Sequence, residues 1–194
     1  MGFFQKLFSR SPSAKVAAST FDAKIDYYKS LGFFPHLSKE EIERLHREDW
    51  GKELTIESPW DEVFLLKYDT TTTWTGDPEA DVCQGNEVYA ETLQAWAKIT
   101  NGQFAPAQIE ETWQAEEGPI AVSFLLGERR VTLEPKYCDD WIDLDILSDL
   151  NRVIESTGKR FNCAVDGNFC LVLFLTPEVE ARLRRERNFP FALS

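Results

Sequence analysis

The sequence predicts an α+β fold: a mostly antiparallel sheet of about five to six strands covered by helices, with an N-terminal helical hairpin. Apolar residues recur at helical spacing in the first quarter of the chain, which predicts the hairpin. Further along, short apolar runs are joined by tight turns, as in an antiparallel meander. Because these strands are adjacent in the chain, an antiparallel sheet is favoured over a doubly wound parallel one.

The helical hairpin is predicted between residues 20 and 50. Its first helix, residues 20–31, ends before Gly32, since glycine readily takes the left-handed conformation that closes a helix. Ser38 and Glu41 form a capping-box pattern, so the second helix begins there.

Three different segments are expected next. Residues 61–68 form an apolar run that we interpret as a strand. Residues 69–85 are rich in Thr, Asp, Pro and Gly and predict a loop. Residues 86–100 show helical spacing and end at an Asn-Gly pair, which predicts a third helix.

The clearest β signal follows. Residues 107–115 and 129–134 alternate between polar and apolar positions, and residues 120–126 form a continuous apolar run. Short turns separate the three segments, so they predict an antiparallel meander with one face covered by helices.

Two more helices are predicted near the C-terminus. One spans residues 143–156 and is closed by Gly158. The other begins at Thr176-Pro177, because Thr is a good N-cap and Pro suits the first helical position.

Between these helices lies a predicted hairpin with Asp166-Gly167 as its two-residue loop. That loop would place Cys163 opposite Cys170, at a distance that permits a disulfide. Two free thiols packed as small apolar groups are the expected state in a reducing compartment. Residues 170–175 are continuously apolar, which predicts a central strand.

The predicted domain organisation is a single α+β domain over residues 20–194. It combines the hairpin at 20–50 with a sheet-containing body at 60–194, after a flexible or amphipathic arm at residues 1–19. Fraying of the arm or docking on the protein's own core is favoured over membrane contact through residues 1–10, because one short helix binds lipid weakly.

The chain of 194 residues is strongly acidic, with 33 acidic and 21 basic residues and a net charge of −12. Both ends are weakly basic, so residues 21–176 carry a surplus of 16 negative charges. This argues against a nucleic-acid binder, which needs a basic face toward phosphate. It favours a basic protein as partner, because opposite charges accelerate association.

The sequence contains few motifs that are typical of a metal site, a cofactor site or a catalytic site. The four cysteines show no zinc-site spacing, and neither a secretion signal nor a membrane span is recognisable, so we expect free thiols in the cytoplasm. His36 and His46 are expected to be exposed structural residues. No phosphate-binding or nucleophile motif occurs, and we expect no cofactor.

The candidate binding residues are carboxylates gathered around one tryptophan: Asp139, Asp140, Trp141, Asp143, Asp145 and Asp149. The helix macrodipole favours acids at the start of a helix, which is the structural explanation of the cluster. The functional alternatives are a docking patch for a basic partner and a site for Mg²⁺ or Ca²⁺. We expect neither a metal nor a catalytic residue, and Trp141 is the best candidate for a hot spot.

These observations favour a non-catalytic cytoplasmic binding protein, of the inhibitor or immunity type, that masks a basic partner. The alternative is a carboxylate-based hydrolase acting on a sugar or other small molecule, with acids from residues 69–85 or 134–149 and tryptophan as a platform. Two carboxyl groups facing each other across a pocket would favour the hydrolase.

Overall fold

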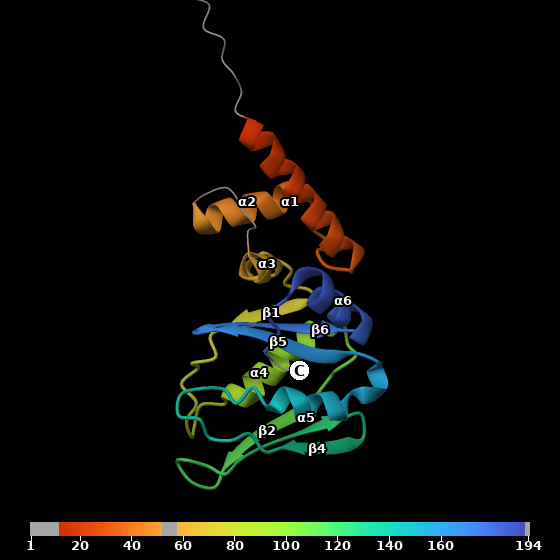
Figure 1. The fold of residues 1–194 in the computed structure, drawn as a ribbon. Coiled ribbons are helices and arrows are strands. Elements are labelled where there is room, and N and C mark those ends of the chain that lie inside the picture. Colours follow the sequence, from red (N-terminus) through yellow and green to blue (C-terminus); the bar gives the residue numbers. More distant parts are fainter. Residues whose placement is uncertain (1–11, 52–57, 193–194) are drawn as a thin grey trace, which may run out of the picture. The chain divides into compact units, whose positions relative to one another are not determined.

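The computed structural model describes residues 12–51 and 58–192 (Figure 1). The chain divides into two compact units, residues 1–57 and residues 58–194, and each is described by itself. Its class is α+β, as the sequence predicts, with six helices and six strands in the described residues. None of the helices in these residues combines the length and the hydropathy that crossing a bilayer requires.

The first unit contains α1 (Pro12–Ser30) and α2 (Lys39–Trp50). The helix α1 begins eight residues before the predicted start, because Pro12 is compatible with the first turn of a helix. The rest of the predicted arm, residues 1–11, lies outside the described residues.

The capping box of α2 is confirmed: the Ser38 hydroxyl accepts from the backbone N–H of Glu41, whose carboxylate accepts from the N–H of Ser38. One expectation in this helix is wrong. His46 is buried and stacks on Trp50, with the ring centroids 6.2 Å apart, whereas His36 is exposed as expected.

The second unit begins with a helix where the sequence analysis predicts a strand. Residues Pro59–Leu66 form α3, which is capped by Ser58 and Asp61 and has Pro59 at its first position. An apolar run of this length is ambiguous between strand and helix, and here the cap decides. The predicted loop that follows contains a short strand, β1 (Thr73–Gly76).

One three-stranded antiparallel sheet has the order β1-β6-β5, with β5 spanning Arg160–Asp166 and β6 spanning Phe169–Leu175. The central position expected for residues 170–175 is confirmed. The expected register is wrong, because Asp166 pairs with Phe169 and leaves Gly167 and Asn168 as the loop. Cys163 therefore faces Val172 rather than Cys170, and both thiols are free and buried.

The other sheet is the predicted meander, formed by β2 (Ala107–Trp113), β3 (Ile120–Leu126) and β4 (Arg129–Leu133). Burial alternates along β2 and β4, as the sequence pattern indicates. The six strands thus form two sheets, where the sequence analysis expects one.

Two helices lie between the sheets: α4 (Val88–Lys98) and α5 (Ile146–Val153), the second of which continues into the 3₁₀ turn η1 (Glu155–Thr157) (Figure 1). Helices and both sheets share one core, in which Phe161 of β5 contacts Trp96 of α4 and Phe104. The last helix, α6 (Pro177–Arg187), starts at the predicted Thr176 cap.

Candidate functional site

Two loops far apart in the sequence pair at one end of the second unit, on the left in Figure 1. One follows β1 and the other precedes α5. The backbone N–H of Ala80 donates to the carbonyl of Asp140, and that of Ile142 donates to the carbonyl of Pro78, each at 2.8 Å. A β-bridge joins Glu79 to Trp141 between these two bonds.

The paired loops display five exposed carboxylates around an exposed indole. We call this group the acidic loop surface: Asp77, Glu79, Asp81, Asp139, Asp140 and Trp141. Asp81 and Asp139 take left-handed backbone conformations, with φ of 55° and 52°, which aspartate tolerates better than most residues. The turns at Asp81 and Asp139 therefore help to position the side chains of the acidic loop surface.

Within residues 12–51 and 58–192, these five carboxylates have no cationic side chain beside them. No described Lys or Arg lies within ion-pair distance of any of them. Their side-chain contacts are with amides: Asn168 donates to Glu79 at 2.5 Å, and Asn86 donates to Asp81 at 3.3 Å. An amide orients a carboxylate and leaves its charge in place, so the surface remains strongly negative.

The phenol of Tyr137 lies in the field of this surface. Its pKa is raised above the ordinary value, first by burial and then by the charges of Asp139, Glu117, Asp140 and Glu116. The negative charge therefore extends from the paired loops to the turn between β2 and β3.

Trp141 stands out among the tryptophans of the second unit because 38% of its surface is exposed. Its backbone N–H donates to the carbonyl of Cys138 at 3.1 Å, and the bridge to Glu79 holds it from the other side. A large aromatic side chain on a fixed backbone has little entropy to lose on binding, which is a property of interface hot spots.

Asp143, a candidate from the sequence, has a structural position. It is buried, and its carboxylate accepts hydrogen bonds from the backbone N–H groups of Lys136, at 2.8 Å, and Asp145, at 3.0 Å. Its own backbone N–H donates to the hydroxyl of Tyr89, whose pKa is raised mainly by burial. Asp143 therefore shapes the loop that carries Trp141.

The remaining two candidates are exposed or half-exposed but paired with cations. The carboxylate of Asp145 accepts a hydrogen bond of 3.0 Å from the ammonium of Lys136, and this bond raises the pKa of Lys136. Asp149 pairs with Arg152, which lies one turn later in α5. Asp145 is the N-cap residue of α5, which begins at Ile146, and its backbone already has helical dihedral angles. Neither residue belongs to the paired loops.

Asp77, Glu79 and Asp81 enter the sequence predictions only as unnamed acids of residues 69–85 in the hydrolase alternative, and not as binding residues. They lie some 60 residues before Trp141, and nothing local in the sequence links the two loops. In the described residues, no group of His, Cys, Asp and Glu side chains has an arrangement that could hold a metal ion.

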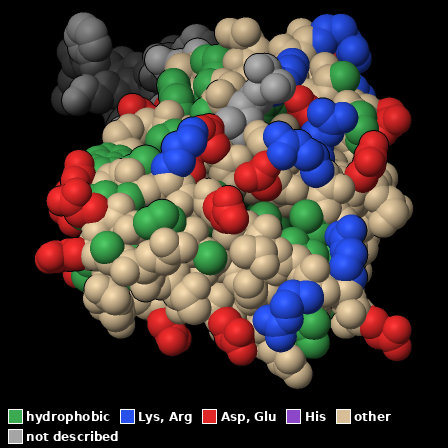
Figure 2. Space-filling view, turned by 90° about the horizontal axis from the view of Figure 1, so that it is seen from below, with side chains coloured by type: hydrophobic (Ala, Val, Ile, Leu, Met, Phe, Trp, Pro, Cys, Tyr) green, Lys and Arg blue, Asp and Glu red, His purple; other side chains and the backbone are tan. Residues whose placement is uncertain are grey.

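The charge of the chain is concentrated in the second unit. Residues 58–194 contain 24 acidic and 12 basic residues, so the whole net charge of −12 falls on them. Seen from the side of the β2–β3–β4 sheet, acidic groups stand along the left margin and basic groups gather toward the upper right (Figure 2). Comparison with protein-family models, curated proteins and solved structures finds no match to this chain.

Proposed function

We propose that this chain is a non-catalytic cytoplasmic binding protein whose acidic loop surface masks a basic protein partner, as inhibitors and immunity proteins do. The observation that carries the proposal is the display of five exposed carboxylates around Trp141 without a described cation beside them. The four cysteines are free thiols, in keeping with a reducing compartment.

The physical argument is one of complementarity. A negative surface attracts a positive partner over about 10 Å at moderate ionic strength, and so raises the association rate. Trp141, which is bridged to Glu79, supplies apolar area on the same surface, which charges alone do not. Backbone pairing between the two loops holds these groups in place before a partner arrives.

The alternative, a carboxylate-based hydrolase, has less support. Such chemistry needs two carboxyl groups facing each other across a pocket. The acidic loop surface is exposed, and the hollow near the end of α5 is lined by one carboxylate, Glu155.

Affinity capture from the source cells at low salt, followed by binding measurements with the purified captured protein, tests the proposal. We expect a basic protein whose affinity falls about tenfold or more with Asp139→Asn/Asp140→Asn and with Trp141→Ala. The matched control is Glu128→Gln/Glu178→Gln, which removes the same charge from exposed positions outside the acidic loop surface. This control should leave the affinity nearly unchanged.

Two results would contradict the proposal. One is a captured partner whose affinity responds equally to both double variants, because the net charge alone would then explain binding. The other is binding that is insensitive to salt and to Trp141→Ala.

A further inference from the structure

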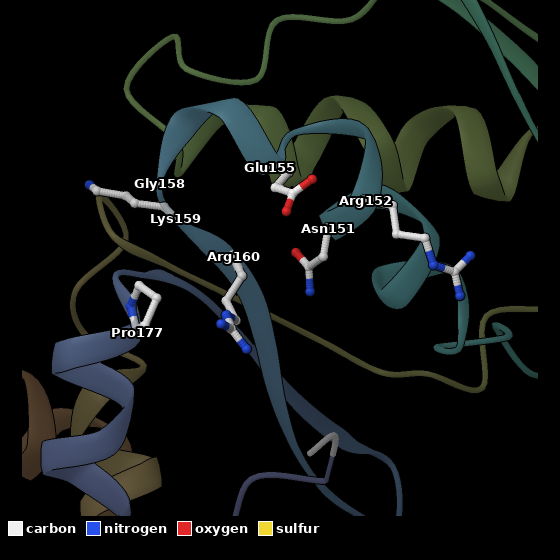
Figure 3. A pocket seen from close by; sticks show the side chains of 7 residues that line it. All are labelled: Asn151, Arg152, Glu155, Gly158, Lys159, Arg160 and Pro177. Atoms are coloured by element: carbon white, nitrogen blue, oxygen red, sulfur yellow. The ribbon is translucent and has the colours of Figure 1, made fainter.

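A hollow of about 370 Å³ lies at the opposite end of α5 from the acidic loops (Figures 1 and 3). It is formed where the end of α5 and η1, the start of β5 and the start of α6 come together. The lining residues are Asn151, Arg152, Glu155, Gly158, Lys159, Arg160 and Pro177. Its volume lies within the range of about 300–1,000 Å³ that is typical of small-molecule sites.

The charge of this lining is the reverse of the charge of its surroundings. The second unit has twice as many acidic as basic residues, whereas the hollow has three cations and one carboxylate. Figure 3 shows Lys159 and Arg152 on opposite sides of the hollow, with their charged ends pointing away from each other, and Arg160 between them at the start of β5. The lining side chains carry a formal charge of +2 at neutral pH, which the carboxylates of Asp149 beside Arg152 and Glu180 beside Arg160 offset in part.

The three cations are only weakly engaged by the protein. The guanidinium of Arg160 lies 3.7 Å from an oxygen of Glu180, beyond hydrogen-bond distance. Arg152 pairs with Asp149, but both side chains are exposed, and such a pair is worth about 0–1 kcal/mol. Lys159 lies over the ring of Phe174, 5.4 Å from its centroid. Each of these cations can therefore turn to a ligand at small cost.

The floor of the hollow is rigid. The side-chain amide of Asn151 donates to the carbonyl of Phe161 at 2.8 Å and accepts from its backbone N–H at 2.7 Å. This pair of bonds fixes the start of β5 against α5, so Arg160 keeps its position relative to Arg152. Because the amide of Asn151 is already bonded to the backbone of Phe161, the polar contacts to a ligand are made by the three cations.

We propose that this hollow binds a small organic molecule that carries a phosphate monoester. Arginine forks match phosphate oxygens, and a phosphate monoester carries nearly two negative charges at neutral pH, so it can compete with Asp149 and Glu180 for the two arginines. The volume exceeds what a phosphate group fills, so we infer an organic part that lies along Pro177 and the aliphatic stem of Lys159. This site is independent of the acidic loop surface.

Titration of the ¹⁵N-labelled chain with phenyl phosphate, followed by amide chemical shifts at constant ionic strength, tests the proposal. We expect saturable shifts confined to residues 151–160 and the start of α6. Phenyl phosphate should bind most tightly, inorganic phosphate more weakly, and benzoate most weakly. The affinity for phenyl phosphate should also fall as the pH is lowered through about 6, where the phosphate takes up its second proton.

Matched variants separate a specific site from general attraction. Lys159→Gln/Arg160→Gln should weaken binding of phenyl phosphate about tenfold or more, and Arg152→Gln about threefold. The control Lys98→Gln/Arg130→Gln removes the same charge outside the hollow and should change the affinity less than about twofold. Glu155→Gln should tighten binding of phenyl phosphate, because it removes the one carboxylate of the lining. A variant that merely lost structure would bind more weakly.

Clear results would overturn the proposal. These are shifts spread over the whole surface, equal weakening by both double variants, or no saturation below about 10 mM. Benzoate binding as tightly as phenyl phosphate would overturn the assignment of the ligand class.

Discussion

Glu111 caps a helix that lies 22 residues earlier in the chain: its carboxylate accepts a hydrogen bond of 2.9 Å from the backbone N–H of Tyr89. The same oxygen accepts from Ala90 at 3.2 Å, and the other oxygen accepts from the indole N–H of Trp113. The N-cap residue of α4, Glu87, makes no side-chain capping bond of its own. A residue of β2 therefore supplies the cap and joins α4 to the second sheet.

Replacing Glu111 by Ala is expected to lower the free energy of unfolding by about 1–2 kcal/mol, because two N–H groups at the start of α4 lose their acceptor. Urea unfolding of the two proteins measures the difference. Glu110→Ala is the control, since Glu110 is exposed and lies 3.5 Å from an exposed Arg130. Equal destabilisation by both variants would show that the cap contributes nothing.

Replacing Asn151 by Ala is expected to cost about 1–3 kcal/mol of stability, because it removes both hydrogen bonds to the backbone of Phe161 and leaves those groups unpaired. Ser148→Ala, at an exposed position of the same helix, should change stability by less than about 0.5 kcal/mol. Denaturant melts of the variants provide the comparison, and an unchanged midpoint for Asn151→Ala would refute the expectation.

Trp96 is fully buried, and within the described residues its indole N–H has no hydrogen-bond partner. Trp96→Phe removes this unpaired donor and keeps an aromatic ring against Phe161, so we expect a loss of less than about 1.5 kcal/mol. Trp96→Ala leaves a large cavity and should cost about 3–5 kcal/mol. Thermal unfolding distinguishes the two, and similar losses for both variants would indicate that the N–H is satisfied.

Burial raises the pKa of the Cys163 thiol from its ordinary value of 9.0 to about 12, and it also raises the pKa of Cys170. Because the folded state holds these protons more tightly, the contribution to stability is complete below pH 9.0 and is lost as the pH rises toward 12. Cys163→Ala should flatten the fall of stability with pH above about 9, as measured by urea unfolding across that range. If the stability of the Cys163→Ala variant falls as steeply with pH as that of the original chain, the Cys163 thiol is not the group responsible.

Local signals in the sequence predict much of the secondary structure. The caps at Ser38 and Thr176 and the meander are confirmed, because each depends on residues that are close in the chain. The helix α3 carries an equally local signal in Ser58 and Pro59, but the apolar run after them also fits a strand, and the sequence prediction of a strand there is wrong. The hairpin register is shifted, since a loop of two residues fits either Asp166-Gly167 or Gly167-Asn168.

The sequence by itself determines the α+β class and most helix boundaries, because caps and periodicity are signals within a few neighbouring residues. It also determines the surplus of carboxylates, which is a property of composition. Only the tertiary structure decides that six strands form two sheets, that Glu79 joins Asp140 and Trp141 on one surface, and that Asp143 is buried. It also brings Arg152 and Arg160 to one hollow. The physical reason is that these arrangements depend on packing and hydrogen bonds between segments whose separation in the chain leaves no local pattern.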